Sequence, residues 1–197
     1  DEDIVRFAAE IHKNSNRLLT LINDIIRLSE LDQVEEQNCF EELDIYDIAQ
    51  NCVEMLRLSA KKHDVTMELH GVHRIICANR QMMDELVYNL CDNAIRYNNP
   101  GGRVDITVDA AVAFDKTAET GATIIEVKDT GIGISKEHQE RIFERFYRVD
   151  KSRSKSTGGT GLGLAIVKHI VAAHKNASLS LTSEPVSYTH LTLPTIR

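Results

Sequence analysis

The sequence has no run of eighteen apolar residues and no charged segment leading into an apolar one, so we expect nothing in it to span a membrane. It also has only four cysteines, which lack both the paired spacing of a zinc site and the density of a disulfide framework. We therefore expect reduced thiols and a cytoplasmic setting. The four are Cys39, Cys52, Cys77 and Cys91.

An excess of positive charge is missing as well. Lysine and arginine number 23 against 30 aspartates and glutamates, which gives a net charge of −7 at pH 7. This balance excludes a general binder of nucleic acid or of anionic membranes. The 197 residues, 42% of them hydrophobic, can bury a sizeable core and suit one domain with an appendage. Because the chain begins without Met inside a helical pattern, we expect it to be part of a longer protein.

Residues 4–31 predict a long amphipathic helix. Its heptad positions are apolar except for Asn14, and a second apolar row widens the stripe beyond a two-stranded seam. Such a face needs partner helices, from this chain or a second copy, unless it packs on the chain's own globular domain. The linker-like segment LDQVEEQN that follows favours the bundle. The heptad residues are Ile4, Phe7, Ile11, Asn14, Leu18, Leu21, Ile25 and Leu28, and the second row is Leu19, Ile22 and Ile26.

From Phe40 the pattern changes to that of a compact α/β domain. Asp44 is a predicted N-cap for a helix from Ile45 to about Lys62. The segment FDKTAETG is a predicted hairpin loop, and there are no internal repeats. The inner stripe of the helix after Asp44 is Ile48, Cys52, Met55 and Leu56. Further helices are predicted at about 80–98, 136–146 and 161–174, and strands at 65–69, 74–78, 103–112, 123–128 and 178–182.

The helix around residues 83–98 carries two stripes. One is apolar and faces a core; the other is polar, and asparagine in mid-helix costs stability because its side chain competes for backbone hydrogen bonds. The polar stripe is either a solvated face or a site for a polyanion and a metal, and the rest of the chain must decide. The apolar stripe is Met83, Leu86, Val87, Leu90 and Ala94, and the polar one is Glu85, Asn89, Asn93, Arg96 and Tyr97.

The motif DTGIGI follows a predicted strand directly, beginning at Asp129. Gly131 and Gly133 would let the backbone approach a flat ligand closely. A carboxylate at the strand end can accept a hydrogen bond from an exocyclic amine such as that of adenine. The same pattern is also a common turn, so it does not establish a site by itself.

Two further segments favour an anionic ligand. Residues 141–155 hold six basic residues against two acidic ones, which indicates either an anion nearby or a solvated face, and the serine-rich end KSRSKST predicts a mobile lid. Residues 158–164, GGTGLGL, then open a helix whose unpaired N–H groups would cradle an anion, unless they are a plain glycine hinge. No Lys-Ser/Thr pair follows the glycines and no strand precedes them, which excludes a P-loop and a dinucleotide fingerprint.

Asn-x3-Asn on a helix, DTGIGI, IFERFYRVD and GTGLGLAIVKHIV, in this order and spacing, resemble the catalytic and ATP-binding domain of sensor histidine kinases. The helix FAAEIHKNSNRLLTLINDIIRLSELD resembles the second helix of that family's dimerisation domain, most similar to the phosphate- and cell-wall-sensing type of Gram-positive bacteria. The resemblance covers residues 1–184. It implies an α+β fold, a two-layer sandwich of the Bergerat (GHKL) type with a mixed sheet and helices on one face, preceded by one long helix from a dimeric bundle. The implied domains are 1–35, with the first dimerisation helix missing, and 39–184, with the final strand missing.

The resemblance also implies a role for each matching residue. Asp129 would bind the adenine amino group, with Gly131, Gly133 and Ile134 shaping the base pocket. Asn93 would ligate Mg²⁺ through its amide oxygen, since this ion prefers oxygen ligands. The catalytic residues implied are Asn89, Asn93 and Arg148. The implied ATP-binding residues are Asn89, Asn93, Arg96, Tyr97, Asp129, Gly131, Gly133, Ile134, Arg148, Lys151, Gly159, Thr160, Gly161, Leu162 and Gly163.

Within that set, Asn89 would help order the metal site, Arg96 would contact phosphate and Tyr97 would pack beside the base. Arg148 and Lys151 would meet the terminal phosphates, and residues 159–163 would form the lid hinge and anion cradle. Phosphoryl transfer needs mainly positioning and charge neutralisation, which this set supplies without a nucleophile.

The implied function is to hold Mg²⁺-ATP for γ-phosphoryl transfer to a histidine, and from there to an aspartate of a response-regulator receiver domain. The implied parent is a membrane-anchored homodimer, joined through the helical bundle, with this part in the cytoplasm. The family's acceptor histidine is followed by an acidic residue and, a few positions on, a proline. No histidine here has that context, His12 included, so we expect ATP binding without autophosphorylation.

Two alternatives remain open. One is an ATP hydrolase of the same superfamily, such as the gyrase, mismatch-repair or chaperone ATPases, which place a water-activating Glu on this helix. Asn89 stands near that position and cannot act as a base, and Glu85 lies one turn earlier. The other is a non-catalytic nucleotide-binding module that docks partners through the helix of residues 4–28, against which the intact Asn93, Asp129 and GTGLG argue.

The last residues depart from the family. From Val186 the string VSYTHLTLPT resembles a translated transposase-type sequencing adapter, so we expect residues 186–197 to be non-native and His190 to be no site. Its alternating pattern, with Val186 and Tyr188, is nevertheless compatible with a strand beside residues 178–182.

Overall fold

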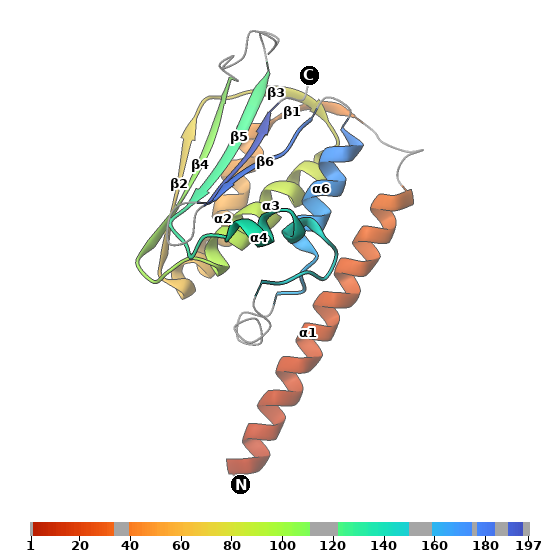
Figure 1. The fold of residues 1–197 in the computed structure, drawn as a ribbon, viewed down its shortest axis with the longest axis vertical. Coiled ribbons are helices and arrows are strands. Elements are labelled where there is room, and N and C mark those ends of the chain that lie inside the picture. The colour runs from red at the N-terminus through yellow and green to blue at the C-terminus, as the bar shows by residue number, and fades with distance from the viewer. Residues whose placement is uncertain are drawn as a thin grey trace.

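The fold is described from a computed structural model, which covers residues 2–33, 40–110, 122–149, 159–174, 177–183 and 189–194. Figure 1 labels the elements along the chain. The helices are α1 (Glu2–Gln33), α2 (Ile45–His63), α3 (Arg80–Arg96), α4 (Lys136–Gln139), the 3-10 helix η2 (Arg141–Phe143) and α6 (Gly163–Ala173). The strands are β1 (Glu41–Asp44), β2 (Val65–Gly71), β3 (Ile75–Ala78), β4 (Gly102–Ala110), β5 (Thr123–Asp129), β6 (Ser180–Ser183) and β7 (Thr189–Pro194).

A five-stranded mixed sheet forms one layer of the fold. Its strand order is β2-β4-β5-β7-β6, with β2 and β4 parallel and the remaining neighbours antiparallel. A separate antiparallel pair, β1 with β3, joins Glu41 to Ala78 and Asp44 to Ile75. β4 and β5 alternate between buried and more exposed residues, as expected of a sheet with one face on a core.

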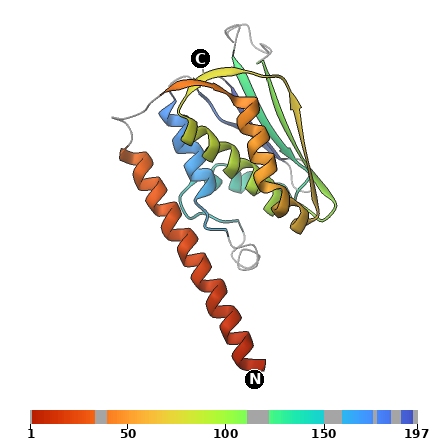
Figure 2. The ribbon, with the colours of Figure 1, turned by 180° about the vertical axis from the view of Figure 1, so that it is seen from behind.

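The second layer consists of α2, α3 and α6, which cover one face of the sheet (Figures 1 and 2). The core lies between the layers, where Leu90 of α3 and Ile170 of α6 are almost fully buried with Ile106 of β4. The predicted two-layer α+β fold with helices on one face of a mixed sheet is confirmed. The predicted apolar stripe of α3 is confirmed too, because its members Met83, Leu86, Val87, Leu90 and Ala94 are all buried.

α1 leads away from this sandwich as a single long helix and touches it at α6 (Figures 1 and 2). Its apolar side chains are exposed, from 69% for Ile4 to 49% for Ile26, and only Leu21 is half-buried among the apolar residues described there. Packing on the chain's own domain therefore leaves most of the stripe uncovered. No helix in the described ranges is long and apolar enough to cross a membrane.

The start of α2 forms as predicted. Asp44 is its N-cap, and its Oδ1 accepts a hydrogen bond of 3.0 Å from the Tyr46 backbone N–H. The prediction for Met55 is wrong, because this side chain is 69% exposed while Cys52 and Leu56 are buried. The buried face of α2 is narrower than the predicted stripe and leaves Met55 on its solvent edge.

The predicted helix over 136–146 is also wrong. The segment breaks into α4 and η2, and then Glu144 is extended and Phe146 has a φ of 64°. The Phe146 N–H donates to the Gly161 carbonyl at 2.9 Å, which joins this segment to the chain just before α6. A tertiary hydrogen bond thus takes the place of another helical turn.

The remaining predictions concern strands and thiols. β1 was not predicted, and β7 lies antiparallel beside β6, in agreement with the alternation seen near the end of the sequence. The predicted hairpin loop lies outside the described residues, but the strands on either side of it, β4 and β5, are antiparallel neighbours. Cys52, Cys77 and Cys91 are free, and Cys39 lies outside the described residues.

Candidate nucleotide-binding site

The two asparagines of the polar stripe lie where α3 meets the first residue of α6. The Asn89 side-chain amide donates to the Glu85 carbonyl at 2.8 Å, which fixes the carboxamide plane. A Cβ atom at Gly163 would lie 2.8 Å from Asn89 Oδ1 and 3.5 Å from Asn93 Nδ2. Glycine at this position therefore lets the N-terminus of α6 approach both carboxamides.

The N-terminus of α6 is shaped to present backbone N–H groups. Its N-cap, Leu162, makes no side-chain capping bond to the first turn. The Leu162 N–H itself is directed to Thr160 Oγ1 at 3.3 Å. Gly161 has a φ of 79° and turns the chain into the helix. A Cβ atom at this position would lie 3.0 Å from backbone atoms of Phe146 and Tyr147. These features fit an anion placed between α6 and α3.

Asp129 ends β5 and starts the glycine turn. The residue is 9% exposed, and its Oδ1 accepts a hydrogen bond of 2.8 Å from the Gly131 N–H. The Ile132 N–H donates to the Tyr97 carbonyl at 3.1 Å, and a Cβ at Gly131 would lie 2.4 Å from that carbonyl oxygen. The turn is therefore packed against the end of α3, and only glycine fits at position 131.

The second half of the turn is held by β6. Gly133 has a φ of 66°, and the Ile134 N–H donates to Ser183 Oγ at 2.8 Å. Gln139 donates to the carbonyls of both Ile134 and Ser183, at 2.8 and 2.7 Å. Ser183 and Gln139 were not predicted, because their contribution depends on contacts between segments far apart in the sequence.

Thr130 joins the same turn to the loop after α3. Its hydroxyl accepts from the Arg103 N–H at 2.9 Å and donates to Asn98 Oδ1 at 3.1 Å. The Asn99 side chain donates to the Thr130 carbonyl at 3.3 Å. The sequence analysis assigned no role to Asn98, Asn99 or Thr130, because this network depends on contacts between two segments.

Arg96 is held by an acidic partner that the sequence analysis did not single out. Its Nε lies 2.6 Å from Asp92 Oδ2, one helical turn earlier. Burial by itself lowers the pKa of Arg96, but the charge of Asp92 and its hydrogen bond raise that pKa above its ordinary value, as do Tyr88 and Tyr97. The guanidinium thus stays charged at the end of the polar stripe.

Arg148, Tyr97 and Gly159 converge on one point. A Cβ at Gly159 would lie 3.5 Å from Arg148 Nη2 and 3.6 Å from the Tyr97 hydroxyl. The segment before α6 therefore lies close to the Tyr97 side chain at the end of α3, and Arg148, the predicted phosphate-binding arginine, lies beside it. Lys151 and Gly158 lie outside the described residues.

The predicted residues thus form two clusters along α3. Asn89 and Asn93 lie with Gly163 at one, and the Asp129 turn lies against the Tyr97 carbonyl at the other. Tyr97 also contacts the segment before α6, because its hydroxyl approaches Gly159. Two amide side chains beside a helix N-terminus suit a hydrated Mg²⁺ and phosphate, and the glycines let the neighbouring segments approach one another closely.

The family described as histidine kinase-, DNA gyrase B-, and HSP90-like ATPase matches residues 78–197. The chain belongs to this family. Its similar curated relatives include the sensor-like histidine kinase SenX3 of Mycolicibacterium smegmatis, 38% identical over 98% of this chain and 48% of the relative. The sensor histidine kinase RppB of Synechocystis is 40% identical over 88% of this chain and 36% of the relative. The chain therefore spans about half or less of the length of these relatives.

Among solved structures, the mycobacterial sensor histidine kinase MprB is similar, with a TM-score of 0.62 and 26% identity over 79% of this chain and 97% of that one. The chain thus carries the ATPase-type catalytic domain of sensor histidine kinases, as the motifs predicted. The family match begins at the last residue of β3 and includes α3, the Asp129 turn and α6.

Proposed function

We propose that the chain is the ATP-binding catalytic core of a two-component sensor histidine kinase. In this role it positions Mg²⁺-ATP so that a histidine can attack the γ-phosphoryl group. The observation that carries the proposal is the convergence of Asn89 and Asn93 with the N-terminus of α6, on the same helix whose end packs against the Asp129 turn.

The base end of the site selects adenine. Asp129 accepts from the Gly131 N–H through Oδ1, which fixes the carboxylate so that it can also accept from the exocyclic amine of adenine. Gly131 and Gly133 keep the floor of the pocket free of side chains, and Ile134 contributes an apolar wall. Tyr97 packs beside the base.

The phosphate end neutralises and orients the triphosphate. Asn93 would hold Mg²⁺ through its amide oxygen. Asn89, one helical turn before Asn93, is fixed by its hydrogen bond to the Glu85 carbonyl. The ion, when bound, would supply positive charge that offsets the charge of the phosphates. The first-turn N–H groups of α6, with Thr160 and residues 161–163 before them, hold the phosphates, and Arg148, Lys151 and Arg96 add positive charge.

Transfer to a histidine is favoured over hydrolysis because the polar stripe offers no base at position 89. A carboxamide cannot accept a proton from water, whereas the hydrolases of this family need a carboxylate there. ATP hydrolysis remains the second candidate, through Glu85. Steady phosphate release at ordinary turnover by the chain alone would favour that candidate.

The parent protein follows from the same proposal. We infer a homodimer formed through α1, an acceptor histidine outside these 197 residues, and a response-regulator receiver domain as the next phosphoryl acceptor. The parent would be a membrane-anchored sensor with this part in the cytoplasm. Residues 1–35 would be the second dimerisation helix and residues 39–184 the native part of the catalytic domain.

The first experiment is an ATP titration of the chain by calorimetry, with Mg²⁺ and with EDTA. Binding that is tighter with Mg²⁺ supports the site, and absence of binding in both conditions overturns it. The second adds a polypeptide that carries the acceptor helix and looks for acid-labile, base-stable phosphate. Phosphohistidine on the added helix supports the kinase, while ATP binding without transfer would leave a nucleotide-binding docking module.

We also propose that residues 186–197 do not derive from the native protein. The family match extends to residue 197, and β7 fills a position inside the sheet, so the segment is used by the fold whatever its origin. Sequencing the source genomic DNA across codon 184 tests this point. A native reading frame that continues into VSYTHLTLPT would contradict it.

A further inference from the structure

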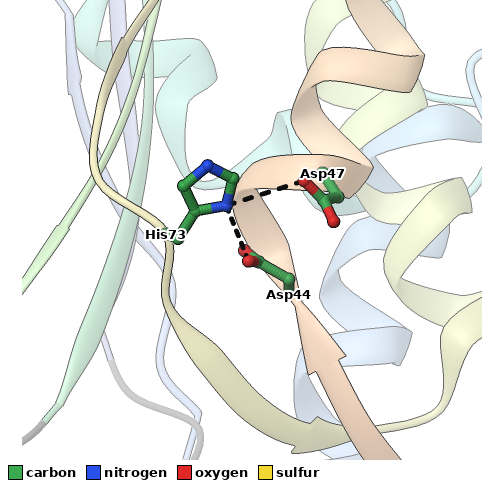
Figure 3. Close-up of side chains that lie close together, drawn as sticks. All are labelled: Asp44, Asp47 and His73. Atoms are coloured by element: carbon green, nitrogen blue, oxygen red, sulfur yellow. Dashed lines mark hydrogen bonds and ion pairs between the residues drawn. The ribbon is translucent and has the colours of Figure 1, made fainter.

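A second cluster of chemically active side chains lies at the start of α2, outside the nucleotide site. It consists of Asp44 at the end of β1, Asp47 in the first turn of α2 and His73 in the loop between β2 and β3 (Figure 3). His73 Nδ1 lies 2.7 Å from Asp44 Oδ2 and 3.6 Å from Asp47 Oδ1. The three potential ligand atoms lie within 4.8 Å of one another. We call this group the His73 cluster.

The charge of the His73 cluster is not balanced. Among the described residues, the ion pairs of Asp44 and Asp47 involve His73 alone, so one imidazole serves two carboxylates. The Arg74 side chain is directed to β5, where it donates to Thr123 Oγ1 at 3.3 Å. Two carboxylates and an imidazole nitrogen that face one another without a lysine or arginine are an incomplete set, which a divalent cation would complete.

A second group of acidic and histidine side chains in the molecule has its charge balanced by an arginine. Glu68, His70 and Asp105 form a similar group on β2 and β4. There, Arg103 donates to Asp105 Oδ2 at 2.9 Å and lies 4.0 Å from Glu68. A guanidinium already occupies the place of a cation in this second group, so a metal ion would have to displace it.

The backbone pre-orients one ligand of the His73 cluster. Asp44 Oδ1 accepts from the Tyr46 N–H at 3.0 Å and from the Arg74 N–H at 3.3 Å. These two bonds fix the carboxylate and leave Oδ2 facing the imidazole. The His73 ring also lies 4.7 Å from the Tyr46 ring, which limits its rotation. Hydrogen bonds to the far side of a ligating carboxylate are a regular feature of metal sites.

We propose that Asp44 Oδ2, Asp47 Oδ1 and His73 Nδ1 bind one divalent transition-metal ion of the Zn²⁺ type, with water in the remaining position. Zinc bonds of about 2.0–2.2 Å place ligand atoms roughly 3.3 Å apart in a tetrahedron. The 3.6 Å separation of Nδ1 and Asp47 Oδ1 is close to this value. The 2.7 Å hydrogen bond to Asp44 must open when the ion replaces the Nδ1 proton.

The ligand set also selects the ion. An imidazole nitrogen with two carboxylates suits zinc or nickel, whereas Mg²⁺ prefers oxygen ligands alone. The site would therefore ignore the Mg²⁺ that accompanies ATP. It would join the end of β1, the first turn of α2 and the β2–β3 loop, where β1 passes into α2 (Figure 3).

The test is a calorimetric titration of the full chain with ZnSO4, in a Cys77→Ser background that removes the exposed thiol. We expect saturable binding, and loss of affinity of about tenfold or more in both Asp47→Asn and His73→Gln. The matched control, His70→Gln, should bind as the background does. Thermal unfolding without zinc checks that each variant folds; Asp47 and His73 are 61% and 65% exposed, so neither change disturbs the core.

A second readout identifies the bound atom. A long-range ¹H–¹⁵N NMR spectrum of the imidazoles should show the Nδ1 resonance of His73 moving on addition of Zn²⁺, and no such change with Mg²⁺. Absence of saturable zinc binding, affinity in the Asp47 and His73 variants equal to that of the background, or loss of binding in the His70 variant would each overturn the proposal. In those cases the His73 cluster is only an ion pair at a helix N-cap.

Discussion

Asp129 holds the turn together, and we propose that the same carboxylate also binds the ligand. Its Oδ1 accepts a hydrogen bond from the Gly131 N–H, so the turn needs an acceptor oxygen at this side-chain position. The side-chain oxygen of asparagine can keep that bond, but its NH2 would then face the amine of adenine. The turn should survive this substitution while the base loses its partner.

The first prediction is therefore that Asp129→Asn weakens ATP binding by about a hundredfold or more, since an unpaired buried polar group costs about 1–3 kcal/mol on each partner. Calorimetric titration measures the affinity, and urea unfolding checks the fold. Asp109→Asn, an exposed change on the neighbouring strand β4, is the matched control. An unchanged ATP isotherm in Asp129→Asn would remove the adenine assignment.

Gly163 supports a second prediction at this scale. Gly163→Ala would place a Cβ 2.8 Å from Asn89 Oδ1, and the carboxamide must rotate away from its bond to the Glu85 carbonyl. We expect affinity for Mg²⁺-ATP to fall about tenfold, or 1.4 kcal/mol. Gly159→Ala, with contacts of 3.5 and 3.6 Å, should cost less. Equal affinities in the two variants would contradict the close approach of α6 to Asn89.

At the scale of single elements, α3 combines the core and the site. Its apolar stripe packs against α2, α6 and the sheet, and its polar stripe carries the asparagines. The position of the asparagines therefore depends on the packing of the opposite side of the helix. Rigid support from a packed element is what a binding site of this kind needs.

The prediction for α3 compares two leucines. Leu90→Ala removes a side chain that is 1% exposed and should lower the free energy of unfolding by about 2–5 kcal/mol. Leu58→Ala, on α2, removes one that is 80% exposed and should change it by no more than about 0.5 kcal/mol. Urea denaturation followed by circular dichroism gives both values. Similar losses in the two variants would mean that the buried stripe of α3 is assigned wrongly.

Some of the helices and strands could be predicted from the sequence and others could not. The two stripes of α3 and the N-cap at Asp44 are local signals, so periodicity and residue type predict them. β1 was not predicted because it is only four residues long and its sequence, EELD, contains three acidic residues, which disfavour a strand. Pairing with β3 stabilises the strand in spite of them. The early end of the predicted helix over 136–146 was not predicted, because it depends on the bond from Phe146 to Gly161.

The site divides in the same way. Its glycines and asparagines stand in recognisable motifs, but the contact of Asn89 and Asn93 with Gly163 depends on how α6 packs on α3. The Arg96–Asp92 pair has i,i+4 spacing and was readable from the sequence. Ser183 and Gln139 had no such signal.

On the scale of the whole molecule, α1 is the element through which we propose that two copies meet. Its exposed apolar stripe includes Ile11 at 66% and Ile22 at 51%. We predict that the chain dimerises in solution and that Ile11→Asp with Ile22→Asp shifts it to a monomer, because each buried charge opposes helix packing. Light scattering after size-exclusion chromatography measures the mass. ATP affinity should be unchanged, which separates assembly from the site.

A monomeric wild-type chain at high micromolar concentration would contradict this prediction. Glu10→Gln with Asn16→Asp is a suitable control, because it changes polar residues of the same helix that lie off the heptad positions. The control should stay dimeric.

The place of β7 has a further consequence for the sheet. It is hydrogen-bonded to β5 on one side and to β6 on the other, so removing it would open two strand edges facing each other. A chain cut after Glu184 should therefore be less stable and prone to edge-to-edge association. The gap should also accept a strand added in trans: a peptide of residues 186–197 should raise the melting temperature of the shortened chain, whereas the same peptide with Thr192→Pro, which removes a ladder N–H, should not.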